Sequence, residues 1–139
     1  MATKPIVLID LNIILDVLQK REPFYAASAR LLGAVEGELL EGYLAAHSIT
    51  TLFYLIQKDK SSADARAAIT NLLQILKIAP VTQSTVDQAL NLDYSDFEDA
   101  VQMISAVQCK ADYLITRNIS DYKPALLPVL QPVDFLSTL

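Results

Sequence analysis

The sequence predicts an α/β protein, a three-layer α/β/α sandwich in which a central parallel sheet lies between two layers of helices. Three observations support this fold class. Short apolar runs alternate with segments of helical periodicity, and the connections between them are short. The strongest run, residues 5–9, is apolar and rich in β-branched residues, as in a strand that is buried on both faces. Because parallel strands need crossover connections, helices are expected on both faces of the sheet.

The expected strands are short apolar runs that end at polar residues or proline. They cover residues 5–9, 42–46, 78–81, 113–116 and 128–131. The expected helices have apolar residues spaced three or four apart. They cover residues 12–19, 23–38, 52–56, 61–76, 84–90 and 95–109, with a final turn from residue 132. The residues expected to begin these helices are Pro23, Ser48 or Thr50, Ser61 or Ser62, a capping box of Ser95 with Glu98, and Pro132.

Length and composition predict a single domain over residues 1–139. Of the 139 residues, 53% are hydrophobic and 19% are charged, whereas average domains have about 45–50% and about 25%. This composition excludes intrinsic disorder. No apolar run approaches the roughly 18 residues of a membrane-spanning helix, and residues 1–5 do not resemble an export signal. With Cys109 as the single cysteine, no intramolecular disulfide is expected, and we predict a cytoplasmic protein that does not enter membranes.

Polar side chains follow the ends of two of the strongest strands. Asp10 directly follows the first strand, and Asn118 comes just after the strand at 113–116. Asp96 and Asp99 begin the helix that leads into this second strand, and their i, i+3 spacing places them on one helix face. If the two strands are neighbours, these side chains meet at the carboxyl edge of the sheet, where open α/β sheets bind ligands.

A cluster of this kind predicts a divalent metal site. Neighbouring carboxylates repel each other unless a cation neutralises them, and oxygen ligands favour Mg²⁺ or Mn²⁺ over zinc. The predicted metal ligands are Asp10, Asp99 and Asn118, and Asp96 joins these three in the predicted catalytic set.

Each acidic residue also has a structural interpretation. Asp10 is suited to cap the helix that follows it, and Glu98 is better explained by the capping box than by catalysis. For Asp96, in a first helical turn, a helix-dipole role and a catalytic role remain equally open. Asp16 is expected on a solvated helix face, whereas Asp121 is left open between the site and a solvated turn.

Other catalytic motifs are missing from the sequence. The only histidine, His47, excludes a histidine-rich metal site, and it is expected to cap or pack. No serine lies in a G-x-S-x-G motif, and there is no glycine-rich phosphate loop. The six tyrosines are expected to belong to the core, because they lie at apolar-periodic positions.

Four segments together resemble the PIN-domain family of ribonucleases. They are Ile-Asp-Leu-Asn-Ile-Ile-Leu-Asp at 9–16, Asp-Phe-Glu-Asp-Ala at 96–100, Ile-Thr-Arg-Asn-Ile-Ser-Asp-Tyr at 115–122, and the closing segment 128–136. The resemblance spans nearly the whole chain. It implies a small α/β/α sandwich whose acidic cluster binds Mg²⁺ or Mn²⁺ and cleaves single-stranded RNA. Many members are toxins of VapC-type toxin–antitoxin pairs, so an antitoxin protein is an implied partner.

Carried over to this chain, the family's first aspartate falls on Asp10 and the aspartate of its central helix on Asp99. The aspartate after the strand-end threonine falls on Asn118, which still offers an oxygen ligand. The glutamate of the helix after the second strand falls on Thr51, so the acidic cluster is incomplete. The resemblance therefore implies a metal-dependent endoribonuclease, or alternatively a catalytically weak or inactive module that binds RNA or a partner protein.

Charge and hydrophobicity lead to two further expectations about partners. The net charge of −5 opposes binding of a polyanion by the molecule as a whole, so RNA binding would require a local basic stripe. Its candidate residues are Lys58, Lys60, Arg66, Lys110 and Arg117. The apolar excess predicts a two-fold homodimer beside the acidic cleft, with its contact surface on the helix at 52–56 and the long helix that carries Leu73.

Overall fold

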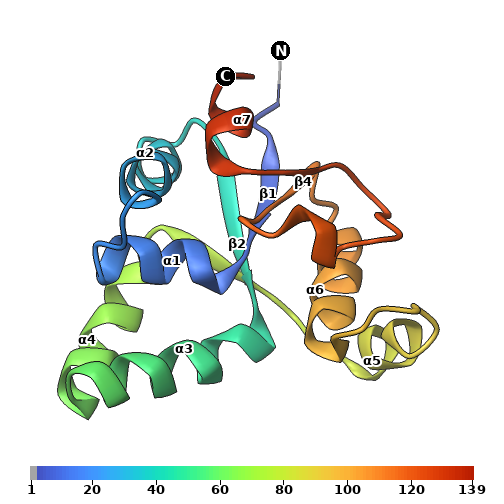
Figure 1. The fold of residues 1–139 in the computed structure, drawn as a ribbon, viewed down its shortest axis with the longest axis horizontal. Coiled ribbons are helices and arrows are strands. Elements are labelled where there is room, and N and C mark those ends of the chain that lie inside the picture. The colour runs from blue at the N-terminus through green and yellow to red at the C-terminus, as the bar shows by residue number, and fades with distance from the viewer. Residues whose placement is uncertain (1–2) are drawn as a thin grey trace.

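The computed structural model describes residues 3–139. Its middle layer is one sheet of five parallel strands in the order β3-β2-β1-β4-β5 (Figure 1). The strands are β1 (Ile6–Ile9), β2 (Glu41–Ala45), β3 (Leu76–Ala79), β4 (Tyr113–Ile115) and β5 (Val129–Leu130). The predicted parallel sheet is confirmed. Residues 1–2, part of the segment considered as an export signal, lie outside the described residues.

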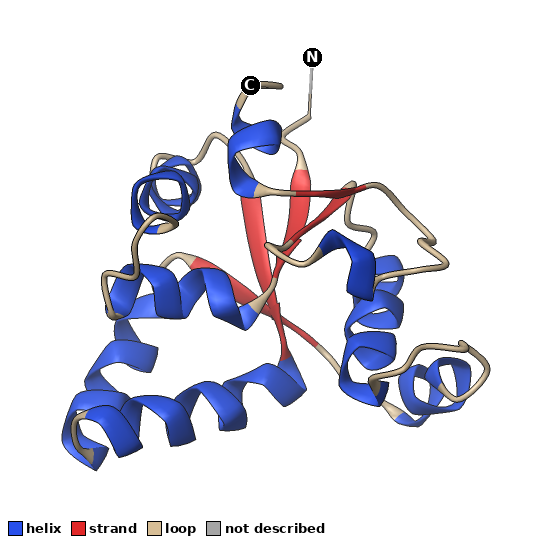
Figure 2. Ribbon diagram, in the orientation of Figure 1, coloured by secondary structure: helices blue, strands red, loops and turns tan. Residues whose placement is uncertain are grey.

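Helices cover both faces of the sheet, as the sandwich requires (Figure 2). One layer contains α1 (Leu11–Leu18), α2 (Tyr25–Glu36), α3 (Ala46–Asp59), α4 (Ser62–Leu72) and α7 (Pro132–Leu136). The other layer contains α5 (Gln83–Ala89), α6 (Phe97–Gln108) and the short 3-10 turn η1 (Ile119–Asp121). None of the helices within residues 3–139 is both long and apolar enough to cross a membrane.

The central strand β1 is buried on both faces, as its sequence predicts. Val7 and Ile9 pack into the core beneath α1 to α4, whereas Leu8 packs with Met103 of α6 on the opposite face. β1 lies between β2 and β4 in the sheet. The carboxyl ends of β1 and β4 are therefore adjacent, which is the arrangement that the predicted site needs.

Three helix starts differ from the prediction. α2 begins at Tyr25 instead of at Pro23. α3 begins directly after β2 without a side-chain cap, so neither Ser48 nor Thr50 begins it. α6 is capped by Asp96, which accepts a hydrogen bond from the backbone N–H of Glu98 at 2.9 Å, and the predicted capping box of Ser95 with Glu98 is wrong. Ser61 does cap α4, as expected.

The long helix from residue 61 ends earlier than its apolar periodicity suggests. α4 stops at Leu72, and Leu76 is the first residue of β3, which runs from 76 to 79 instead of from 78 to 81. Helical and strand periodicities share this apolar position, so the sequence alone assigns it to the wrong element.

The surface expected to form a dimer contact is largely part of the core. Leu52 and Ile56 of α3, Leu72 of α4 and Leu76 of β3 are all buried in the core, whereas Leu73 is 46% exposed. The apolar face of this hairpin therefore packs against its own sheet and leaves little apolar surface for a partner.

Candidate functional site

Asp10 lies at the carboxyl end of β1 and contacts both α1 and β4. Its Oδ1 accepts a hydrogen bond from the backbone N–H of Asn12 (3.3 Å), which caps α1. Its Oδ2 accepts a hydrogen bond from Oγ1 of the buried Thr116 at the end of β4 (2.8 Å). Asp10 is only 8% exposed. The cap and the site are therefore not alternatives, since one carboxylate oxygen serves α1 and the other is held at the sheet edge.

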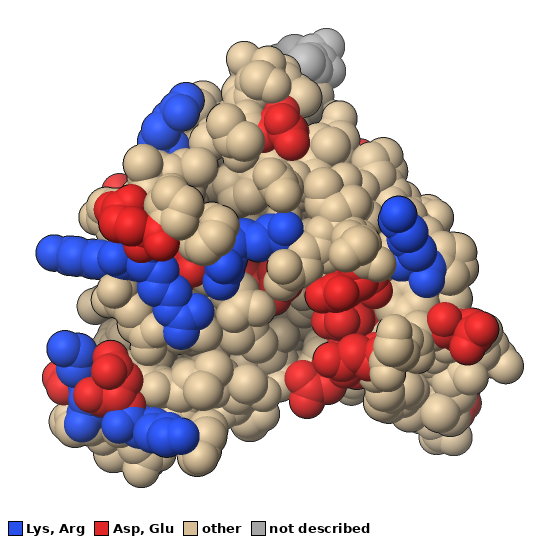
Figure 3. All heavy atoms as spheres, viewed as in Figure 1, with Lys and Arg blue, Asp and Glu red and all other residues tan. Residues whose placement is uncertain are grey.

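Asp99 lies in the first turn of α6, in a crowded acidic environment. The pKa of Asp99 is raised to about 6, mainly by burial and also by the charges of Asp96, Asp10 and Asp121, whereas a hydrogen bond from Tyr122 opposes the shift. On the face shown in Figure 3, acidic side chains gather over the start of α6 and the adjoining turn. The structure thus brings Asp99 within electrostatic reach of Asp10 and produces the repulsion between carboxylates that a cation relieves.

Asn118 and Asp96 are more peripheral than these two aspartates. Asn118 is exposed at the start of η1, and its backbone N–H donates to Thr116 Oγ1 at 3.1 Å. Asp96 is exposed and caps α6. Thr51, the residue on which the resemblance places a glutamate, is partly buried on α3. Among residues 3–139, no three His, Cys, Asp or Glu side chains form a group able to hold a metal ion.

The donor atoms fit Mg²⁺ or Mn²⁺ better than zinc. Asp10 and Asp99 offer carboxylate oxygens and Asn118 an amide oxygen, whereas structural zinc sites use nitrogen and sulfur ligands. Mg²⁺ retains several water molecules and is usually held by one or two carboxylates together with substrate phosphates. A pair of carboxylates is therefore sufficient for such a cation, although it is a smaller set than three acidic residues would provide.

The expectation that Asp16 is solvated is wrong. Asp16 is fully buried, and its Oδ2 lies 2.9 Å from Nε of Arg117, whose guanidinium group stacks over the ring of Phe24 at 4.0 Å. The pair is an ion pair without hydrogen-bond geometry in the described part of the chain. Burial raises the pKa of Asp16, and the charge of Arg117 opposes this shift. Arg117 comes from the loop after β4, so no local sequence pattern around Asp16 indicates the contact.

Tyr122 is the site residue that the sequence interpretation missed. It is 2% exposed, as expected for a core residue, but its hydroxyl donates to Oδ1 of Asp99 at 3.2 Å. A buried tyrosine hydroxyl normally has a hydrogen-bond partner. In the sequence, the signal that Tyr122 lies near the site was its position directly after Asp121, a residue already considered for the site. His47 packs as expected: its Nε2 donates to the carbonyl oxygen of Glu98 (3.2 Å), and burial lowers its pKa.

The predicted basic stripe does not form as one surface. Arg117 is paired with Asp16, and Lys110 follows α6 in the opposite helical layer. Instead, Lys20, Arg21 and Lys60 line a hollow of about 500 Å³ between the ends of α1 and α3. Figure 3 shows basic side chains gathered on this side of the same face that carries the acidic side chains.

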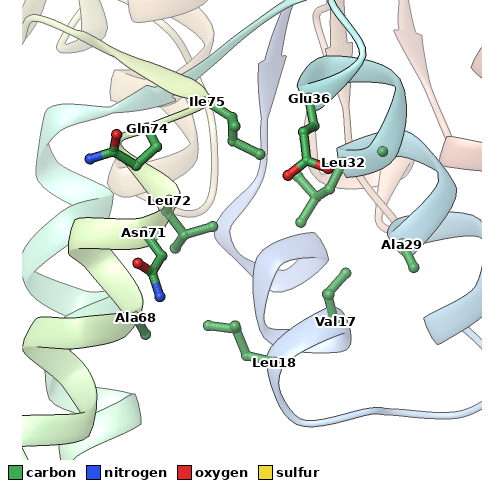
Figure 4. A pocket seen from close by; sticks show the side chains of 11 residues that line it. Val17, Leu18, Ala29, Leu32, Glu36, Ala68, Asn71, Leu72, Gln74 and Ile75 are labelled. Atoms are coloured by element: carbon green, nitrogen blue, oxygen red, sulfur yellow. The ribbon is translucent and has the colours of Figure 1, made fainter.

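A second hollow, of about 580 Å³, lies between α1, α2 and α4 (Figure 4). Its walls are mainly aliphatic, with Leu18, Leu32 and Ile75 among the lining side chains, and Glu36 is the only carboxylate among them. We call it the α1–α2–α4 groove. It contains no pair of acidic residues and is not a candidate catalytic centre.

Comparison with known proteins agrees with this architecture. The sequence profile of the PIN domain matches residues 6–120. No curated protein sequence matches the chain significantly.

Several solved structures share the fold at low sequence identity. FitAcB from Neisseria gonorrhoeae has a TM-score of 0.70 at 18% identity, over 91% of this chain and 98% of its own. A toxin–antitoxin complex from Klebsiella pneumoniae has a TM-score of 0.68 at 21% identity, over 91% and 97% of the two chains. VapC20 from Mycobacterium tuberculosis, a toxin that cleaves the sarcin–ricin loop, has a TM-score of 0.63 at 15% identity, over 78% and 86%. At these identities the likeness concerns the fold.

Proposed function

The chain belongs to the PIN-domain family, and from this premise we propose that it is a metal-dependent endoribonuclease that cleaves single-stranded RNA. The observation that carries the proposal is the pair of carboxylates at the carboxyl edge of the sheet. Asp10 and Asp99 come from different elements, Asp10 is buried and Asp99 is partly buried, and the charge of Asp10 contributes to the raised pKa of Asp99. Neighbouring carboxylates disfavour each other's charged form, and groups perturbed in this way cluster at functional sites.

Asp10 and Asp99 would hold Mg²⁺ or Mn²⁺, with the amide of Asn118 completing the ligand set. When bound, the cation supplies a water molecule of lowered pKa and stabilises the charge that develops on the phosphate. Thr116 orients Asp10 by donating to its Oδ2. Asp96 caps α6 and so fixes the first turn that carries Asp99.

Substitution of the aspartates tests this assignment. We expect Asp10→Asn to lower the rate of cleavage of single-stranded RNA in Mg²⁺ or Mn²⁺ by on the order of 100-fold or more. Asp87→Asn removes an exposed carboxylate on α5 and serves as the matched control, with activity equal to that of the parent. An Asp10→Asn protein that cleaves RNA as fast as the parent would contradict the assignment of Asp10 to the catalytic metal site.

A second function is favoured by the missing acidic residues. With Thr51 and Asn118 at positions where the family has carboxylates, and no group of three acids among residues 3–139, the alternative is a module that binds RNA or a partner protein without cutting. Titration calorimetry with Mn²⁺ separates the two functions. Saturable binding that is lost in Asp99→Ala supports the nuclease, whereas no binding at millimolar Mn²⁺ supports the module.

We also propose that the chain is the toxin of a VapC-type pair that acts in the cytoplasm, with an antitoxin as its partner. Support comes from structural neighbours described as toxin–antitoxin complexes and, for VapC20, as an RNA-cleaving toxin. Expression of the chain alone should arrest growth, and Asp10→Asn should relieve the arrest. Growth that is unaffected by the parent chain would contradict the toxin proposal but not the nuclease proposal.

A further inference from the structure

We propose that Tyr122 is a positioning residue for Asp99: its hydroxyl, held at the end of a buried hydrogen-bond chain from α3 and α6, fixes the Asp99 carboxylate in the orientation that faces the acidic site. This inference deepens the proposed function and rests on it for its catalytic consequence. The positional statement itself concerns only the contacts of this chain.

The hydrogen-bond chain has three consecutive links. Ser48 Oγ donates to Oε1 of Gln102 at 3.2 Å, Gln102 Nε2 donates to the hydroxyl oxygen of Tyr122 at 3.0 Å, and this hydroxyl donates to Oδ1 of Asp99 at 3.2 Å. Ser48 belongs to α3, Gln102 and Asp99 to α6, and Tyr122 follows η1. The hydrogen-bond chain therefore links three segments that are distant in sequence, and only the hydroxyl of Tyr122 contacts the Asp99 carboxylate.

The direction of each hydrogen bond follows from the previous one. Because the Gln102 carbonyl oxygen accepts from Ser48, its amide NH₂ is the group that faces Tyr122. The Tyr122 oxygen therefore acts as an acceptor towards Gln102, and its single proton is available to Asp99. Oδ1 of Asp99 is thus committed as an acceptor, while Oδ2 is reached by no hydrogen-bond donor among residues 3–139.

Burial makes these hydrogen bonds costly to lose. Ser48, Gln102 and Tyr122 are all nearly inaccessible to solvent, and a buried polar group that loses its partner has no water to replace it. The ring of Tyr122 is also held edge-on by Tyr94, with ring centroids 6.3 Å apart. The hydroxyl is therefore presented to Asp99 by a rigid arrangement of side chains.

The hydrogen-bond chain also explains what α3 contributes to a site that lacks its expected glutamate. Thr51 has no carboxylate. Instead, α3 is connected to Asp99 indirectly, by the hydrogen bonds that link Ser48, Gln102 and Tyr122. A neutral hydroxyl close to Asp99 stabilises its orientation without adding a further negative charge to the acidic cluster.

The direct test measures the side-chain orientation of Asp99 without metal. Three-bond couplings between the Hα and Hβ protons of Asp99 should report one χ1 rotamer in the parent and averaged rotamers in Tyr122→Phe. The matched control is Tyr94→Phe, which removes a neighbouring tyrosine hydroxyl that donates to the carbonyl oxygen of Pro124. The control should retain the couplings of the parent. Unchanged Asp99 couplings in Tyr122→Phe would overturn the proposal.

The functional readout is Mn²⁺ binding measured by calorimetry. Loss of a residue that orients a metal ligand typically lowers metal affinity about 10- to 100-fold, so Tyr122→Phe should bind Mn²⁺ at least about 10-fold more weakly than both the parent and Tyr94→Phe. A merely structural role would lower the melting temperature and leave the Mn²⁺ affinity within about twofold, which would refute the positioning role.

Two further outcomes keep this test separate from the proposed nuclease function. If the parent binds no Mn²⁺ but its Asp99 rotamer depends on Tyr122, the proposed metal site fails and the positioning of Asp99 stands. If Tyr122→Phe does not fold, Gln102→Met keeps the Tyr122 hydroxyl but removes its donor. Averaged Asp99 couplings in this variant support the hydrogen-bond chain, and parent-like couplings contradict it.

Discussion

Asp99 is a carboxylate whose surroundings disfavour its ionised form. Burial is the largest contribution to its raised pKa of about 6, and the nearby charges of Asp96, Asp10 and Asp121 act in the same direction. Tyr122 partly offsets these effects by donating a hydrogen bond. At the scale of single residues, folding therefore creates a preference for the protonated form of Asp99, and the stability of the protein depends on pH as a result.

This preference predicts how stability changes with pH in EDTA. The folded pKa of about 6 lies above the ordinary value of 3.8, so between these values the folded state binds more protons than the unfolded state, and the free energy of unfolding falls as pH rises. Below about pH 4 both states are protonated. Above about pH 6 the full penalty is present, at most about 3 kcal/mol because each pKa unit corresponds to about 1.4 kcal/mol, and less with solvent screening.

Urea unfolding from pH 3.5 to 7 measures this dependence, and Asp99→Asn is the informative comparison. The difference between the free energies of unfolding of variant and parent should change steadily between pH 4 and 6, in favour of the variant. A difference that is constant over this range would contradict the pKa assignment of Asp99.

At the scale of elements, α6 depends on Asp96 for its first turn. Asp96 Oδ1 accepts the backbone N–H of Glu98, and this turn carries Asp99. Ser is an equally good N-cap without charge, whereas Ala cannot accept the hydrogen bond. Asp96 therefore offers a substitution that separates capping from catalysis.

We expect Asp96→Ala to lower the free energy of unfolding by about 1 kcal/mol, with Asp96→Ser close to the parent. If capping is the main role of Asp96, Asp96→Ser also retains RNA cleavage within about threefold of the parent rate. Thermal unfolding and a cleavage assay on both variants measure these effects. Loss of cleavage in a fully stable Asp96→Ser protein would instead place Asp96 among the catalytic residues.

At the scale of the whole molecule, the charge and apolar surface are unevenly distributed. On the face shown in Figure 3, most basic side chains lie on one side together with some acidic ones, and a further group of acidic side chains lies towards the other side. The α1–α2–α4 groove has a mainly aliphatic lining, in which Leu18 is 38% exposed whereas Leu32 and Leu72 are buried. Leu73, 46% exposed, directly follows Leu72 of α4, which lines this groove. Homodimerisation stays a prediction, and this groove is now the surface that we assign to it.

Light scattering at tens of micromolar protein should give a dimer mass, and Leu73→Glu should convert the dimer to a monomer. Leu90→Glu is the matched control, because Leu90 is 67% exposed at the end of α5, in the opposite helical layer. A monomer mass for the parent would contradict the dimer. A dimer that resists Leu73→Glu would place the contact on another surface.

By itself, the sequence determined the fold class and two members of the candidate site. Strand and helix periodicities are local properties, so the parallel sheet, the burial of β1 and most helices could be predicted from them. Asp10 and Asp99 could be placed because each is adjacent to an element boundary and the carboxyl ends of neighbouring parallel strands meet. Errors such as the cap of α6 arose where two polar residues were adjacent and either could accept the same backbone N–H.

Only the tertiary structure decided which distant side chains meet. Thr116 and Asp10 are 106 residues apart, and their hydrogen bond depends on the pairing of β1 with β4. The ion pair of the buried Asp16 is formed with Arg117, which is distant from it in the sequence. The part played by Tyr122 depends on α3, α6 and η1 packing together. Local patterns carry no information on such contacts, because they form only when the free energy of the whole core selects one packing.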